Sequence, residues 1–143
     1  MERAAEERGI QVAAFDMYTY DKFVVGKSYG SDDYALTETL VANWLDMFPG
    51  DDNGECIPPG ILILVQGTAY RNVITPRPPG AVQGGQEFDL HSLPKIGSTL
   101  RTEVICGHKE IRKERRWLKM NFISRTLAGQ LVFKSVNTIL LPA

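Results

Sequence analysis

The side chains best suited to proton-transfer chemistry gather in one polar stretch between Gly50 and Gly60. Asp51 and Asp52 place two carboxylates side by side, and Asn53 follows them directly. A carboxylate held near a substrate can take a proton from carbon or deliver one to a leaving hydroxyl. A Pro-Gly pair opens the stretch, so a solvated turn is the competing interpretation of the same residues. Asp51 and Asn53 are therefore candidate catalytic residues whose alternative is a simple turn.

Cysteine and histidine side chains, the usual nucleophiles and metal ligands, are few and scattered in the sequence. Cys56 has no histidine near it in the sequence, so we interpret it as a small buried hydrophobic residue rather than a nucleophile. His91, beside Asp89, and His108 are expected at the surface. The sequence has no CxxC pair and no His/Cys cluster, so we predict no metal site and no cofactor. Two cysteines, Cys56 and Cys106, are typical of a protein of the reducing cytosol.

Length and charge restrict the classes of function. The chain has 143 residues, with 16 lysines and arginines against 17 aspartates and glutamates, a net charge of −1, and 43% of its residues are hydrophobic. This size predicts one domain with a substantial core. The near-neutral charge gives no electrostatic reason to expect nucleic acid or an anionic membrane as a partner. Apolar runs such as Ile61–Val65 are too short for a membrane span, and the charged N-terminus does not resemble a secretory signal, so we expect a cytoplasmic protein.

The elements that must position these residues follow a poor core segment, residues 1–22, which we predict to be an arm. Phe23–Tyr29 is predicted as a strand that ends at the turn-forming sequence Gly30-Ser31-Asp32-Asp33. Thr37 is a candidate N-cap for a helix whose apolar residues recur with helical spacing from Leu40 to Phe48. This helix would end at the Pro-Gly pair that opens the polar stretch.

A second helix and a series of strands complete the predicted elements. The stretch from Pro59 to Ile74 predicts a central helix, apolar nearly all round in its first half and therefore buried on most sides; a buried strand over Ile61–Val65 is the alternative. Strands are predicted at Val82–Leu90, Thr99–His108, Arg115–Arg125 and Gln130–Leu141, with Lys109–Glu114 as a charged connection. One buried helix followed by long antiparallel strands predicts an α+β domain over residues 23–143.

This order of elements resembles the hotdog fold of the MaoC-like acyl-thioester dehydratases and hydratases. The particular matches are Pro59-Gly60-Ile61-Leu62 at the start of the central helix, Pro94-Lys95-Ile96-Gly97-Ser98-Thr99-Leu100 before a strand, and the final hairpin with Gly129 in its turn. The resemblance covers about Phe23 to Pro142. It implies a single hotdog fold, an antiparallel sheet wrapped around the central apolar helix. It also implies a homodimer, or a heterodimer with another hotdog chain.

The resemblance further implies that an acyl thioester, on coenzyme A or on a phosphopantetheine arm, binds with its carbonyl near the start of the central helix. Unpaired N–H groups at a helix start can hold an enolate-like oxygen, and here they would come from Gly60 and Ile61. Arg77, between two prolines, and Arg116, in a basic cluster, are candidate contacts for the phosphates of such a carrier. A solvated hairpin is the alternative for the basic cluster.

The catalytic pair of this family is incomplete in the chain. MaoC-like hydratases carry an aspartate and a histidine in a motif of the type Gly-Asp-x-Asn-Pro-x-His, which aligns with the stretch that starts at Gly50. Asp51 and Asn53 match their counterparts, Gly54 replaces the proline, and Cys56 stands where the histidine belongs. A cysteine is no simple substitute for a base with a pKa near neutrality.

A second alignment leads to the same difficulty. It compares Met47-Phe48-Pro49-Gly50 with the His-Phe-Pro-Gly motif of the β-hydroxyacyl-carrier-protein dehydratases, and it places Val65 at the acid. Several functions remain open. We favour hydration or dehydration of a 3-hydroxyacyl or enoyl thioester, or of a related polyketide-type substrate, with an atypical catalytic set. The alternatives are a non-catalytic subunit that shapes the acyl pocket of a homologous partner, and a different reaction such as that of a hotdog thioesterase.

Overall fold

The computed structural model describes residues 17–142, which form one five-stranded antiparallel sheet and two α-helices. The elements in chain order are the 3-10 helix η1 (Tyr20–Lys22), β1 (Ser28–Ala35), α2 (Glu38–Met47), the 3-10 helix η2 (Pro49–Asp51), α3 (Ile61–Val73), β2 (Val82–Leu90), β3 (Thr99–Arg112), β4 (Arg115–Thr126) and β5 (Leu131–Leu141). Most of the predicted arm, residues 1–16, lies outside the described residues; at its end, the Tyr18 ring contacts Phe23. No described helix has the length and apolar character that crossing a membrane requires.

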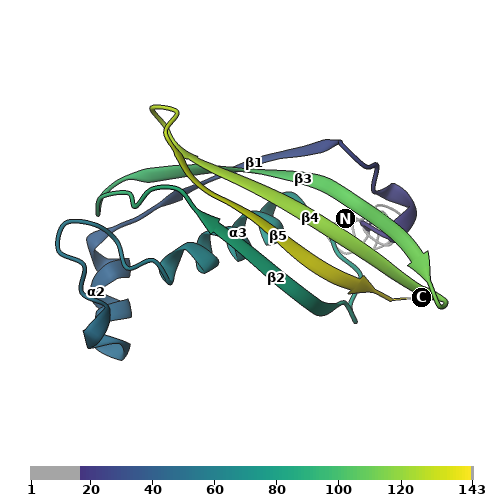
Figure 1. Cartoon of the computed structure of the whole chain (residues 1–143), viewed down its shortest axis with the longest axis horizontal. Coiled ribbons are helices and arrows are strands. Elements are labelled where there is room, and N and C mark those ends of the chain that lie inside the picture. Colours follow the sequence, from purple (N-terminus) through teal and green to yellow (C-terminus); the bar gives the residue numbers. More distant parts are fainter. Residues whose placement is uncertain (1–16, 143) are drawn as a thin grey trace, which may run out of the picture.

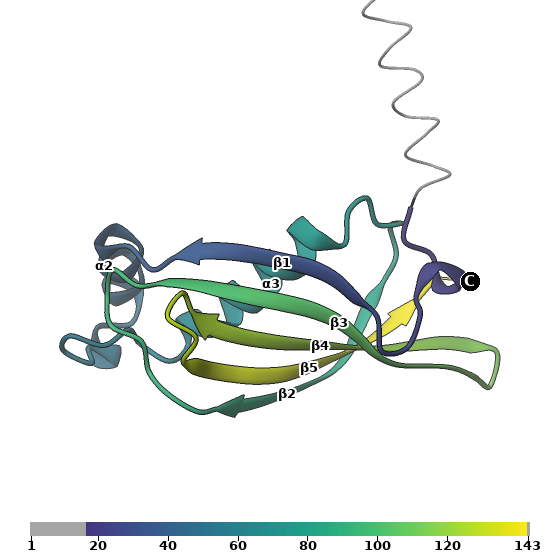
Figure 2. The same ribbon diagram turned by 90° about the horizontal axis from the view of Figure 1, so that it is seen from above.

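The strand order β1-β3-β4-β5-β2 explains why one helix is central. β3, β4 and β5 form a meander through two short connections, whereas β1 and β2 lie at opposite edges of the sheet. The chain must therefore cross the whole sheet between β1 and β2, and α3 makes that crossing along the face around which the sheet curves (Figures 1 and 2).

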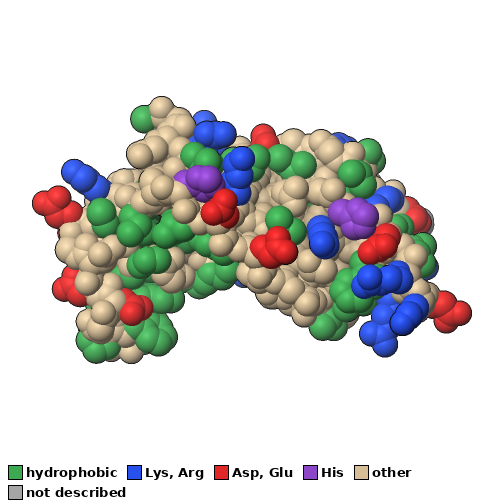
Figure 3. Space-filling model, in the orientation of Figure 1, with side chains coloured by type: hydrophobic (Ala, Val, Ile, Leu, Met, Phe, Trp, Pro, Cys, Tyr) green, Lys and Arg blue, Asp and Glu red, His purple; other side chains and the backbone are tan. Residues whose placement is uncertain are grey.

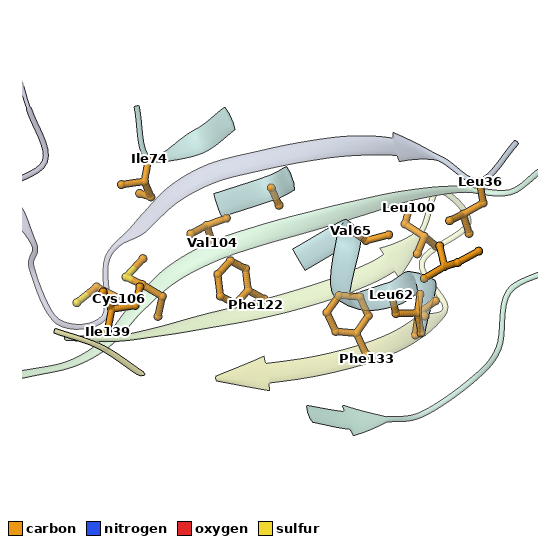
Figure 4. Close-up of a cluster of buried hydrophobic side chains, with 14 of the residues drawn as sticks. Leu36, Leu62, Val65, Ile74, Leu100, Val104, Cys106, Phe122, Phe133 and Ile139 are labelled. Carbon is orange, nitrogen blue, oxygen red and sulfur yellow. The ribbon is translucent and has the colours of Figure 1, made fainter. Parts of the chain in front are cut away.

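The core lies between α3 and the inner face of the sheet (Figure 4). Alternate residues of the central strands point at the helix, among them Val104, Phe122 and Phe133, all with no exposed surface. Leu62 and Val65 face back from α3. Each fully buried side chain of this size contributes about 1.5–3 kcal/mol. The predicted α+β arrangement, a sheet wrapped around a central apolar helix, is confirmed.

The prediction for the first strand is wrong. Phe23–Tyr29 is mostly irregular; Phe23 is buried in an aromatic cluster, and β1 begins only at Ser28. The strand then runs through the residues predicted to turn, with a bulge at Gly30, whose φ is +120°. Polar residues occur here because β1 is an edge strand with a solvated face, where Asp33 forms an ion pair with Arg101 at 2.8 Å.

The two helices begin where the sequence predicts. The Thr37 hydroxyl accepts a hydrogen bond from the Leu40 N–H at 3.1 Å and so caps α2. The stretch Ile61–Val73 is a helix, so the alternative of a buried strand is wrong. The expectation that its first half is buried on most sides is also wrong, because Ile63 and Leu64 are 43% and 39% exposed. The sheet covers one side of α3 and leaves the other open.

The β3–β4 hairpin is longer than predicted. β3 continues to Arg112, and the turn consists of only two residues, Lys113 and Glu114, both with positive φ. The residues expected to form a charged connection therefore pair as strands, and the Arg112 guanidinium lies 4.9 Å from the Trp117 ring centroid. The hairpin projects from the end of the molecule opposite α2 (Figure 2). β2 has the predicted bounds.

Candidate functional site

The polar loop between α2 and α3 packs its first carboxylate against α2. Asp51 is the last residue of η2, and its N–H donates to the Phe48 carbonyl at 3.0 Å. Its Oδ2 accepts a hydrogen bond from the indole Nε1–H of Trp44 at 2.9 Å. The Trp44 ring contacts the Phe48 ring, with centroids 5.0 Å apart. Asp51 is solvent-exposed, yet its carboxylate has a fixed donor.

The next two residues of the loop bond within it. The Asp52 carboxylate accepts from the Gly54 N–H at 3.0 Å, and the Asn53 amide donates to the Ile57 carbonyl at 3.4 Å. The Ile57 N–H donates to the Pro94 carbonyl at 3.0 Å, which fastens the loop to the segment before β3. In this arrangement Asp52 and Asn53 shape the loop, and Asp51 is the carboxylate nearest α2.

The start of α3 lies directly under Trp44. A Cβ added to Gly60 would lie 2.7 Å from Trp44 Cζ2, so the ring approaches this closely only because residue 60 is glycine. The N–H groups of Ile61 and Leu62 donate to the carbonyls of Pro58 and Pro59, both at 3.1 Å. The Gly60 N–H has no hydrogen-bond partner within residues 17–142. Of the predicted donors, Gly60 therefore keeps its N–H available.

Trp44 connects two of the predicted site residues. Carbon atoms of its ring lie against Gly60, and its N–H holds the Asp51 carboxylate. Asp51 and the start of α3 are thus linked through one side chain. A carboxylate and a free backbone N–H at one location are the minimum for removing a proton beside a carbonyl while stabilising the oxygen.

A crevice of about 320 Å³ runs along α3, between this helix and strands β2 and β5; we call it the α3–β2 crevice. Ile63, Gly67 and Tyr70 line it from α3 at spacings of three and four residues, which place them on one face of the helix. Val82 and Ile139 line it from the strands. It begins one turn beyond Gly60, and its volume is in the range of small-molecule sites.

Three amide side chains meet beside this crevice, and we call them the amide cluster: Gln66 on α3, Gln86 on β2 and Asn137 on β5. Gln66 is 4% exposed, and it exchanges two hydrogen bonds with Gln86, at 2.8 and 2.9 Å. Gln86 and Asn137 lie opposite each other in the β2–β5 ladder. Asn137 Oδ1 is buried with no hydrogen-bond partner among the described residues, which costs about 1–3 kcal/mol.

Arg77 and Tyr70 form the far end of the crevice. Nη1 of Arg77 donates to the carbonyls of Arg71 and Ile74, both at 2.8 Å, and so caps the C-terminal end of α3. The Arg77 guanidinium also lies 5.4 Å from the Tyr70 ring centroid. Burial raises the pKa of the Tyr70 hydroxyl, and the positive charge of Arg77 partly opposes that rise. The phenol is therefore a neutral hydrogen-bonding group at physiological pH.

Arg116 lies far from the other predicted site residues. It lines a shallow pocket of about 310 Å³ with Gly80 and Leu140, beside the β3–β4 hairpin. Lysine and arginine side chains gather at this end of the molecule (Figure 3), opposite the end that holds α2 (Figure 1). Within one chain, Arg116 and Asp51 are therefore not brought together.

Among the described residues, the remaining histidine and cysteine side chains form no second catalytic group. His91 is exposed and lies 3.0 Å from the Asp89 carboxylate, which borders a pocket of about 440 Å³ on the outer face of the sheet. Cys106 is fully buried, and burial raises the pKa of its thiol. Cys56 is half-buried. Within residues 17–142, no group of three or more histidine, cysteine, aspartate or glutamate side chains is arranged to hold a metal ion.

Sequence reasoning missed several residues of this region. The helical spacing from Leu40 to Phe48 includes Trp44 but does not indicate that its ring packs on the start of α3. Gln66 carries a usable signal, since it is a polar residue that directly follows the apolar run Ile61–Val65. Asn137 carries no such signal in the sequence, because the alternation of a strand does not reveal a buried amide without a partner.

No family model and no curated protein matches the chain. Solved structures match in fold. A MaoC-like dehydratase from Rhodospirillum rubrum aligns with a TM-score of 0.73 at 13% identity, over 86% of this chain and 96% of that one. The HadBC 3R-hydroxyacyl-ACP dehydratase complex of Mycobacterium tuberculosis aligns with a TM-score of 0.68 at 12% identity, over 82% of this chain and 96% of that one. A hypothetical thioesterase from Streptococcus pneumoniae, solved with coenzyme A, aligns with a TM-score of 0.60 at 13% identity, over 80% of this chain and 82% of that one.

These likenesses establish the fold of the chain. It is the hotdog fold shared by the MaoC-like dehydratases, so the resemblance inferred from the sequence is confirmed at this level. Because a thioesterase also matches in fold, similarity in fold does not identify the reaction.

Proposed function

We propose that this chain is a hydratase or dehydratase of a 3-hydroxyacyl or enoyl thioester, with Asp51 as its acid and base and Gly60 as the donor to the thioester oxygen. One observation carries the proposal: the Trp44 ring lies against Gly60 while its indole N–H holds the Asp51 carboxylate. We infer that this carboxylate reaches a substrate whose oxygen accepts from the Gly60 N–H, which has no partner among the described residues. The fold shared with MaoC-like dehydratases supports this choice of chemistry.

The proposed dehydration uses one carboxylate for both proton transfers. Asp51 takes the α-proton, the electrons of that C–H bond form the Cα=Cβ double bond, and the Cβ–O bond breaks. Asp51 then gives its proton to the departing hydroxyl, which leaves as water. Negative charge that develops on the thioester oxygen is stabilised by the Gly60 N–H. One group must serve twice because Cys56 occupies the position of the family histidine.

We also propose that two copies assemble through strand β2. This strand is an edge of the sheet, and it carries exposed apolar side chains at Val82, Phe88 and Leu90. Ile63 and Leu64 extend the same apolar character onto α3. An exposed apolar edge strand is a ready site for strand pairing, and pairing of like edges gives a closed two-fold dimer.

The second candidate is a non-catalytic hotdog subunit that binds an acyl thioester for a homologous catalytic partner. The replacement of the histidine by Cys56 favours it, and so does the bonding of the Ile61 and Leu62 N–H groups to the preceding carbonyls. Thioester hydrolysis is a third possibility, and release of a free thiol distinguishes it. On each of these readings coenzyme A or a phosphopantetheine arm carries the acyl group.

The test is hydration of crotonyl-coenzyme A by the purified chain, with the mass of the particle measured on the same sample. We expect turnover that falls at least about 100-fold in Asp51→Asn, the usual contribution of an acid or base. Asp52→Asn, which alters a loop carboxylate bonded to Gly54, is the matched control and is expected to keep most of the activity. A folded protein that binds the thioester without turnover would support the non-catalytic subunit instead.

A further inference from the structure

We propose that the α3–β2 crevice binds the distal part of an acyl chain that carries a hydroxyl group, and that the amide cluster (Gln66, Gln86 and Asn137) selects for that group. This inference rests on the proposed function, since it takes the ligand to be an acyl thioester held at the start of α3. It adds a substrate class, thioesters oxygenated far from the carbonyl, and names the residues that determine the preference.

The first support is the polarity of the crevice. A pocket for a saturated acyl chain needs apolar walls only, and Ile63, Val82 and Ile139 would supply them. Gln66 and Asn137 also line this crevice, however, and the Gln66 side chain is almost completely buried. Buried polar groups weaken the binding of an apolar ligand unless the ligand satisfies them.

The second support is the unsatisfied acceptor. Asn137 Oδ1 is buried and has no donor among the described residues, while the neighbouring Gln66 and Gln86 satisfy each other. A ligand hydroxyl would donate to Asn137 Oδ1 and accept from an amide N–H of the cluster. A hydroxyl suits this place better than a carboxylate, because a carboxylate has no hydrogen to give to an acceptor.

The third support is the position of the cluster along the helix. The crevice is lined by Ile63, Gly67 and Tyr70, so it follows one face of α3 away from Gly60. The six residues from Gly60 to Gln66 correspond to a rise of about 9 Å. An extended acyl chain advances roughly 1.3 Å per carbon, given bonds of about 1.5 Å. A thioester carbonyl (carbon 1) beside Gly60 therefore places about the eighth carbon, or the oxygen of a hydroxyl group on the seventh, at the amide cluster.

The test is calorimetric titration of the full chain with octanoyl-, 3-hydroxyoctanoyl- and 7-hydroxyoctanoyl-coenzyme A. We expect the 7-hydroxy compound to bind about tenfold more tightly than octanoyl-coenzyme A, and the 3-hydroxy compound to lack this advantage. Asn137→Leu and Gln66→Met remove the cluster from two different elements, and each is expected to erase the preference for the 7-hydroxy compound, with octanoyl-coenzyme A bound at least as tightly as by the wild type. Asn72→Leu changes an α3 amide that bonds to Asp32 outside the crevice, and is expected to keep the preference.

The outcomes separate this inference from the proposed function. If octanoyl- and 7-hydroxyoctanoyl-coenzyme A bind equally well, acyl-thioester binding stands and the selection by the amide cluster is overturned. The same conclusion follows if both cluster variants fold and keep the preference. If none of the three thioesters binds, the proposed function fails, and this inference fails with it. Thermal unfolding of each variant shows that it is folded before it is titrated.

Discussion

At the scale of single residues, Trp44 decides whether the loop and the helix start act as one site. Its indole bonds to Asp51 at 2.9 Å, and its ring leaves no room for a side chain at residue 60. The two contacts use different parts of the side chain. A substitution can therefore remove the hydrogen bond and keep the ring, which separates the positioning of Asp51 from the covering of Gly60.

Trp44→Phe is the substitution that makes this separation. It keeps an aromatic ring at residue 44 and deletes the donor to Asp51, at a cost near that of one hydrogen bond, about 0.5–1.5 kcal/mol. If Asp51 is the acid and base, we expect kcat for crotonyl-coenzyme A hydration to fall about tenfold, with KM changed less than threefold. Steady-state kinetics measure both quantities.

A control for this substitution is available on the same helix. Phe48→Leu removes the ring that contacts Trp44 without deleting the indole donor, so kcat should stay near the wild-type value. A rise in KM with unchanged kcat in Trp44→Phe would contradict a positioning role. It would indicate that Trp44 contributes to thioester binding alone.

At the scale of elements, helix predictions succeeded where the signal is local. The Thr37 cap and the apolar spacing that follows it give α2, and Pro59-Gly60 before an apolar run gives α3. β1 was missed because its evidence is not local: Asp32 and Asp33 look like turn residues until β3 is present to pair with them. For the same reason, the sequence does not predict the contacts of Trp44 and Asn137, because these contacts involve residues elsewhere in the sequence.

The Asp33–Arg101 pair allows the pairing of β1 with β3 to be tested through pH. Two hydrogen bonds from the Arg101 guanidinium, and then its charge, hold the pKa of the Asp33 carboxyl below its usual range. Since the pKa is lower in the folded state, the stabilisation is present above the unfolded value of about 3.9 and is lost as pH falls through the folded value. Asp33→Asn should therefore lower the urea midpoint slightly at neutral pH, and the difference should vanish at low pH.

Urea unfolding at several pH values measures this effect. Asp46→Asn, a surface carboxylate on α2, controls for the loss of one negative charge elsewhere and is expected to change the pH dependence less. Because both partners are exposed, the effect is small and should weaken further in high salt. A difference between wild type and Asp33→Asn that persists unchanged to acid pH would show that the ion pair is not its source.

At the scale of the whole molecule, the edge strand β2 and the helix α3 border the same crevice. The α3–β2 crevice runs between them, so a second copy seated on this edge would adjoin the crevice. The net charge of −1 offers little electrostatic resistance to association of two copies. A paired β2 edge would also explain why the strand tolerates exposed Val82, Phe88 and Leu90.

Lysine substitutions at the two ends of β2 test this assembly. Val82 and Leu90 are 60% and 42% exposed in the single chain, so Val82→Lys/Leu90→Lys should fold but should not bury two cations between paired edges. We expect sedimentation velocity to show a dimer for the wild type and a monomer for this variant. Leu127→Lys, an equally apolar position in the β4–β5 turn, should remain dimeric because it lies off the β2 edge. A wild-type monomer would overturn the proposed dimer, and a dimeric double variant would show that the interface lies elsewhere. In either case the crevice would have to bind its acyl chain within one subunit.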